Sequence, residues 1–167
     1  MPRTRPTNRT STTSSSEQRK DAPLAICSLI YSSRRTDPDP TGIVESILES
    51  AQRNNALLGL TGALVFDHRF FVQLLEGSRA TVTDMFLRIS QDPRHAEIRL
   101  MRVDETARRR FPVWYMHHAA MRGSGLISAR AYMPQSDFEP SELSAEGAMA
   151  LFDEVAEISR AAKANAA

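Results

Sequence analysis

The order of short apolar segments and amphipathic segments constrains the fold of this chain more than any other feature. Residues 24–31 (LAICSLIY) form a short apolar run between Pro23 and a Ser-Ser pair, which predicts a buried strand. From Ile43 onwards, apolar residues recur at spacings of three and four, which predicts a helix ending near Asn54-Asn55. Two further strands are predicted at 59–66 and 70–75, joined by a turn at 67–69.

A second helix and two more strands are predicted after these elements. Val82, Met85, Phe86 and Ile89 predict a second helix that stops before Pro93. Residues 98–103 predict a fourth strand, and residues 111–117 predict a fifth. The resulting order, β-α-β-β-α-β-β, predicts an α+β fold of the ferredoxin-like type, with a mixed five-stranded sheet and two helices on one face.

The two ends of the chain differ from this central part. Residues 1–22 are rich in Ser, Thr and Arg with almost no large apolar side chain, so we expect a disordered leader, with a transit peptide as the alternative. We expect one domain over residues 23–120, a loop over 121–144 and a C-terminal helix over 145–163.

Composition excludes several classes of protein. A single cysteine, Cys27, rules out an internal disulfide and argues against a zinc site, so we expect no bound metal. The net charge of +1 gives no strong field for nucleic acid or membrane, and no apolar run approaches the length of a membrane span. We therefore expect a cytoplasmic protein.

A few polar residues stand out within the apolar pattern. Gln73 shares a strand face with Phe71 and Leu75, where a buried amide needs hydrogen-bond partners. Tyr31 ends an apolar strand, so its hydroxyl needs a partner too. Each also fits an ordinary core side chain satisfied by the backbone or by solvent.

Asn55 lies on the apolar side of the first helix, beside Asn54, where its amide could contact the polar edge of a flat ligand. The same pair equally fits a left-handed helix cap. Arg94 and His95 follow the second helix, where they could favour its dipole or hold a phosphate. Trp114 and Met116 share one face of the predicted fifth strand, an arrangement also typical of a core.

Other chemistries find little support. The Arg108-Arg109-Arg110 run beside aromatic residues could suggest RNA binding, but the strands lack the aromatic pattern of RNA-reading sheets. No phosphate-binding glycine loop, zinc-protease motif or nucleophile elbow is present. An acylphosphatase-like hydrolase remains an alternative on this fold, although its arginine-bearing glycine loop is missing.

Five strings, taken in order, resemble the BLUF family of blue-light sensors. They are LIYSS, AQRNNALLGLTGALVF, FFVQLLEG, DPRH and RRRFPVWYM, and they cover residues 24 to about 118. The resemblance implies a noncovalently bound FAD and a photoreceptor rather than an enzyme. It implies that Tyr31 donates an electron and a proton to the flavin, and that Gln73 relays the change.

The resemblance also assigns the remaining residues. Asn54 and Asn55 would bind the flavin edge, Arg94 and His95 would lie on its ribityl-phosphate side, and Trp114 with Met116 would report the light state. Because no effector domain follows, we expect the signal to pass to a partner protein, or through a homo-oligomer formed by the sheet or C-terminal helices. A light-inert BLUF-like adaptor is the alternative. The DHRFF turn replaces a glycine often present in that hairpin.

Overall fold

The computed structural model of the chain describes residues 25–36, 43–113, 117–120 and 139–165. The strands are β1 (Ile26–Arg35), β2 (Thr61–Phe66), β3 (Phe70–Gly77), β4 (His95–Thr106) and β5 (His117–Ala120). The helices are α1 (Ile43–Leu58), α2 (Arg79–Ser90) and α3 (Ala145–Asn165), with a short 3₁₀ helix at Pro140–Glu142.

One sheet organises these elements, with its strands in the order β4-β1-β3-β2-β5. The first four strands in this order pair antiparallel with their neighbours, whereas β5 pairs parallel to β2 at the edge. Strands β1 and β3 therefore lie side by side inside the sheet, and the α+β class predicted from the sequence is confirmed.

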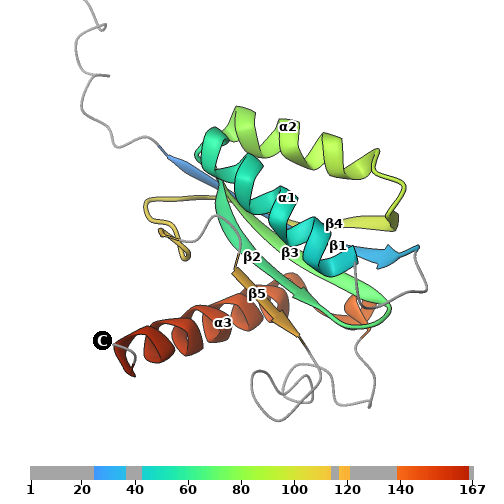
Figure 1. Cartoon of the computed structure of the whole chain (residues 1–167). Coiled ribbons are helices and arrows are strands. Elements are labelled where there is room, and N and C mark those ends of the chain that lie inside the picture. Colours follow the sequence, from blue (N-terminus) through green and yellow to red (C-terminus); the bar gives the residue numbers. More distant parts are fainter. Residues whose placement is uncertain (1–24, 37–42, 114–116, 121–138, 166–167) are drawn as a thin grey trace, which may run out of the picture.

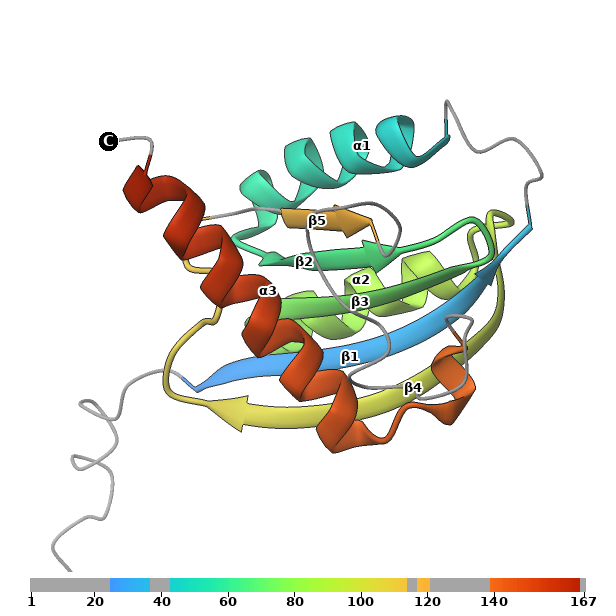
Figure 2. The same ribbon diagram turned by 90° about the horizontal axis from the view of Figure 1, so that it is seen from below.

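Helices cover both faces of the sheet (Figures 1 and 2). Successive strand residues point to opposite faces, so β1 sends Tyr31 towards α1 and α2 and Ile30 towards α3. The α3 face is closed by Leu151, Phe152 and Val155, none more than 2% exposed. Because both faces are covered, the residues of β1 and β3 are buried almost continuously.

Local signals explain where α2 begins and ends. The Ser78 side chain accepts a hydrogen bond from the Thr81 amide (3.1 Å), which satisfies a free donor at the helix start. Pro93 follows the last turn, as the sequence predicted. This end of α2 leads directly into β4 and so fixes residues 92–95 beside the sheet.

The structure corrects the predicted fifth strand, which begins at His117 rather than Phe111. The Phe111 amide donates to a carboxylate oxygen of Glu76 (3.1 Å) instead of to a neighbouring strand. Pro112, which follows, has no amide hydrogen to offer. These two residues therefore form a turn ahead of the strand.

Other boundaries differ less. The predicted loop over 121–144 holds the 3₁₀ helix within its described part, and α3 extends past the expected end at 163. The first strand continues to Arg35 because β3 pairs with it as far as Arg34 and β4 pairs with it as far as Arg35. The predicted leader over 1–22 lies outside the described residues, so the domain boundaries stay a prediction.

Candidate functional site

The antiparallel register of β1 and β3 places Tyr31 directly opposite Gln73. Directly opposed residues of an antiparallel pair project from the same face, and the Tyr31 hydroxyl donates a hydrogen bond to the Gln73 side-chain oxygen, Oε1. Tyr31 is 0% exposed and Gln73 5%. The two residues singled out in the sequence thus form one buried pair.

Burial keeps the Tyr31 phenol protonated. Desolvation raises the pKa of the Tyr31 phenol far above its ordinary value, and the negative charge of Asp92 adds to that effect. The ring also packs edge-on against Phe86 of α2, with centroids 5.5 Å apart. Tyr31 is therefore a neutral, immobilised hydrogen-bond donor at ordinary pH.

Helix α1 supplies one wall beside this pair. Ile47, Ala51, Asn54 and Asn55 line a cavity together with Gln73, as their three- and four-residue spacing requires. Asn55 is 1% exposed. The left-handed residue at the end of α1 is Gly59 (φ 63°), so the cap alternative for the asparagines is wrong.

The segment after α2 supplies the next group of side chains. Asp92 accepts hydrogen bonds from the backbone amide and from Nε of Arg94, both at 2.9 Å. The Arg94 guanidinium lowers the pKa of Asp92 to about 2. The pair is therefore a fixed ion pair, and part of the Arg94 charge is already compensated.

His95 lies deeper than its position at the end of a turn suggested. Its Nδ1 is 2.8 Å from the Ser33 hydroxyl, and its ring centroid is 5.2 Å from that of Phe71. Burial lowers the pKa of His95 to about 4. His95 is therefore neutral at pH 7 and brings no charge to a phosphate.

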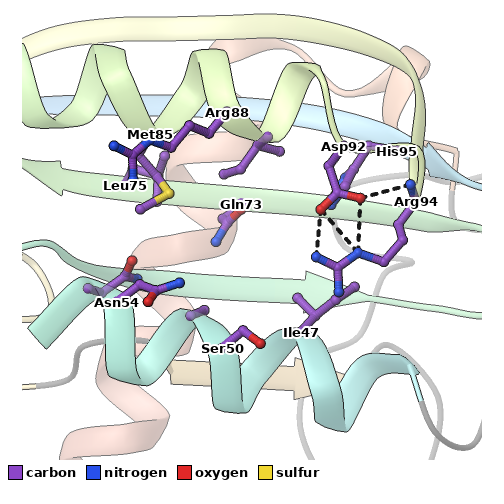
Figure 3. Close-up of a pocket in the computed structure, with 13 residues that line it drawn as sticks. Ile47, Ser50, Asn54, Gln73, Leu75, Met85, Arg88, Asp92, Arg94 and His95 are labelled. Atoms are coloured by element: carbon purple, nitrogen blue, oxygen red, sulfur yellow. Dashed lines mark hydrogen bonds and ion pairs between the residues drawn. The ribbon is translucent and has the colours of Figure 1, made fainter.

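These groups surround a cavity of about 180 Å³ between α1 and α2, with β3 as its floor (Figure 3). Gln73 lies at the centre of the floor, with Asn54 on one side and Asp92 on the other. Five apolar side chains line part of the cavity, and the other lining residues carry amide, hydroxyl, imidazole or charged groups. Such a mixed lining suits a flat ligand that has both an apolar ring surface and polar edges.

Five of the residues assigned from the resemblance line this cavity: Asn54, Asn55, Gln73, Arg94 and His95. Tyr31 joins them through its hydrogen bond to Gln73. Trp114 and Met116 lie outside the described residues, so their assignment stays a prediction.

Sequence reasoning missed several site residues, among them Ser50 and Arg88 of the cavity wall, Ser33 and Asp92. Ser33 was detectable, since it lies two residues after Tyr31 on the same strand face. Asp92 was noticed only as part of the string that ends α2, and nothing in the sequence paired it with Arg94.

Within the described part of the chain, no three His, Cys, Asp or Glu residues gather as metal ligands would. No helix there has the length and apolar character needed to span a bilayer.

A family model for BLUF, the sensors of blue light using FAD, matches residues 26–117, more than half of the 167-residue chain. The chain belongs to the BLUF family. Its cofactor class is therefore FAD, and BLUF domains are photoreceptors rather than enzymes themselves.

Two solved BLUF proteins show how far the likeness extends in space. The dark-state structure of BlrB is 33% identical, with a TM-score of 0.68 over 81% of this chain and 98% of that one. The ground-state structure of BlsA is 26% identical, with a TM-score of 0.72 over 78% of this chain and 87% of that one.

Curated relatives carry the domain within longer proteins. The blue light- and temperature-regulated antirepressor BluF of Escherichia coli is 37% identical over 86 residues, which are 52% of this chain and 21% of that protein. The photoactivated adenylate cyclase subunit beta of Euglena longa is 33% identical over 87 residues, only 10% of its length. The BLUF domain is thus the shared part.

Proposed function

We propose that this protein is a blue-light photoreceptor that binds FAD noncovalently in the cavity between α1 and α2 and signals to a partner protein. One observation carries the proposal, the buried hydrogen bond from Tyr31 to Gln73 at the cavity floor. The proposal includes a cytoplasmic location, a homo-oligomer and a five-stranded ferredoxin-like sheet.

The residues around the cavity fit a flavin ring. Apolar side chains such as Ile47, Leu75 and Met85 offer packing surface, and Asn55 and Gln73 offer amide donors and acceptors. The volume of about 180 Å³ is below the roughly 300–1,000 Å³ of most small-molecule pockets. The cavity would therefore hold at most the flavin ring, and the rest of FAD would lie outside it.

The neighbouring polar residues would take complementary roles. Asn54 and Asn55 would bind the ring edge, and Arg94 would provide the positive charge on the ribityl-phosphate side. His95, neutral at pH 7, would act through packing and hydrogen bonding only. When bound, the flavin supplies absorption of blue light and, once excited, a strong oxidising centre.

The buried pair would convert this excitation into a rearrangement. Tyr31 keeps its proton in the dark because burial raises its pKa, and loss of an electron makes a phenol strongly acidic. Its proton would then pass from Oη to Oε1 of Gln73 along the existing hydrogen bond. Gln73 can rotate or tautomerise to exchange donor and acceptor ends, and the reverse transfers restore both residues.

The output would be a change of conformation because no reactant is consumed. Trp114 and Met116, which follow the turn at 111–113, remain our candidates for reporting the state of Gln73 to a partner. The support for them is the family resemblance, and the E. coli relative, an antirepressor, is an example of a regulatory BLUF protein.

The test is an absorption spectrum of the purified protein in the dark and just after blue light. We expect flavin bands that shift slightly to the red and recover in darkness. Tyr31→Phe and Gln73→Leu should retain FAD but lose this shift. Gln52→Leu, an exposed α1 glutamine that does not line the cavity, is the control and should behave as the wild type.

Three outcomes would contradict the proposal. Flavin bands that do not respond to light would favour the inert adaptor. A protein that takes up no FAD would refute the assignment of the cavity. A shift that survives in Tyr31→Phe would show that another group is the donor.

A further inference from the structure

A second cavity, of about 520 Å³, lies where the segment after β4 runs beside α3, away from the flavin cavity. Four arginines line it, Arg108, Arg109, Arg110 and Arg160, with Asp153 as the one acidic lining residue. The whole chain has a net charge of only +1. The positive charge is therefore concentrated locally at this cavity, and the contacts of each arginine show how much of that charge is compensated.

Arg109 has a structural explanation. Its NH1 donates to the Thr61 hydroxyl (2.9 Å) and to the Glu76 carbonyl (2.7 Å), and its NH2 donates to the Gly59 carbonyl (2.7 Å). These bonds fix the segment after β4 to the ends of β2 and β3. They also hold one guanidinium rigidly at the cavity wall.

Arg110 is only partly explained by its contacts. Its Nε donates to the Asp153 carboxylate of α3 at 2.7 Å. A guanidinium has five N–H donors, so most of those of Arg110 are left for other acceptors. The salt bridge thus orients Arg110 while leaving its terminal nitrogens available at the cavity.

Arg108 and Arg160 have no such explanation. Both are exposed, and neither forms a salt bridge with any described carboxylate. Among the described residues, the Arg160 side chain donates one hydrogen bond, from Nε to the Ala156 carbonyl one turn earlier (3.1 Å). Two like charges facing one cavity repel each other unless an anion lies between them.

We propose that this cavity binds a small organic phosphate of nucleotide size. The arginines suit it because planar guanidinium groups match phosphate oxygens in paired hydrogen bonds. The volume falls within the usual range for small-molecule sites. Pro112 and Val113, the latter 63% exposed, add an apolar surface on which a ring can lie.

An acidic peptide of a partner protein is the rival occupant. The observations favour the small molecule because the charges converge on a hollow of limited volume and because apolar and basic groups lie side by side there. Titration with a nucleotide and with an acidic peptide distinguishes the two occupants.

The experiment is isothermal titration of the full-length, FAD-saturated protein with ADP at low ionic strength, so that the flavin cavity is already filled. We expect one site per chain, and weaker binding of AMP than of ADP. The double variant Arg108→Gln/Arg160→Gln should weaken binding about tenfold or more, since it removes two charge-assisted contacts. The double variant Arg53→Gln/Arg99→Gln alters two exposed arginines outside this cavity and should bind as the wild type.

Three results would overturn the proposal. The first is the absence of measurable binding of ADP to the wild-type protein. The second is equal weakening in both double variants, which would indicate a general effect of net charge. The third is binding of a hexaglutamate peptide, lost in the Arg108→Gln/Arg160→Gln variant, without binding of ADP, which would assign the cavity to a partner segment.

Discussion

Lowering the pH should destabilise this protein through His95. The folded protein keeps His95 neutral because burial lowers its pKa from 6.5 to about 4, whereas the unfolded chain protonates it near 6.5. A group with a lowered folded pKa contributes its stability above the unfolded value and loses it as the pH falls towards the folded value. The sensitive window is therefore pH 6.5 to about 4.

The size of the effect follows from the same two values. Each pKa unit corresponds to about 1.4 kcal/mol. Between about pH 7.5 and about pH 5, the shift from 6.5 to about 4 amounts to about 2 kcal/mol of unfolding free energy. The cause is desolvation by burial, which outweighs the nearby Asp92 carboxylate, whose negative charge raises the pKa of His95.

Urea unfolding at the two pH values measures this loss, and His95→Asn separates it from the titration of carboxylates. The variant should be less stable at pH 7.5, but its further loss at pH 5 should be smaller than that of the wild type by about 2 kcal/mol. An NMR titration of the four histidines gives the pKa directly, with the variant identifying the His95 signal. Equal losses in both proteins, or a His95 pKa near 6.5, would refute the reasoning.

Two further predictions concern the fold. Gly62→Ala places a Cβ 2.0 Å from the Leu74 carbonyl oxygen, so β2 must move and we expect a loss of unfolding free energy of about 3 kcal/mol or more. Gly59→Ala meets no atom within 4 Å and should cost only about 1–2 kcal/mol through its left-handed backbone. Urea unfolding of both variants compares them, and equal losses would contradict the steric argument. Phe152→Ala empties a fully buried position between α3 and the sheet and should cost about 3–5 kcal/mol. Leu57→Ala, at an 87% exposed position, should cost less than about 0.5 kcal/mol. A small loss for Phe152→Ala in the same assay would mean that α3 contributes little to the core.

The sequence predicted the order of elements well because each one carries its own periodic pattern. The helix stripes and the alternation around Gln73 are local properties, and tertiary packing reinforces them. The predicted start of the fifth strand was wrong because of a contact with a residue distant in the sequence. The Phe111 amide is held by Glu76, a residue on another strand, and such a contact leaves no trace in the local pattern.

The candidate site was predictable in part. Periodicity alone placed Gln73, Tyr31 and Asn55 on buried faces, and the family resemblance united them at one cavity. The contact between Ser33 and His95 was beyond prediction because the register of β1 with β4 shifts between Ser32 and Arg34. The role of Glu76 could not be predicted, because an acidic residue at the end of a strand is ordinarily exposed, whereas Glu76 is 0% exposed.

The buried Glu76 carboxylate links the two faces of the sheet through β3. Its carboxylate accepts the amides of Arg110 (2.9 Å) and Phe111 (3.1 Å), on the face of β3 opposite to that of Gln73. Three residues of a strand span only about 10 Å. A sliding or twisting of this single strand would therefore displace the Gln73 amide and the anchor of residues 110–111 together, so a movement at the cavity floor would be carried to the opposite face of the sheet.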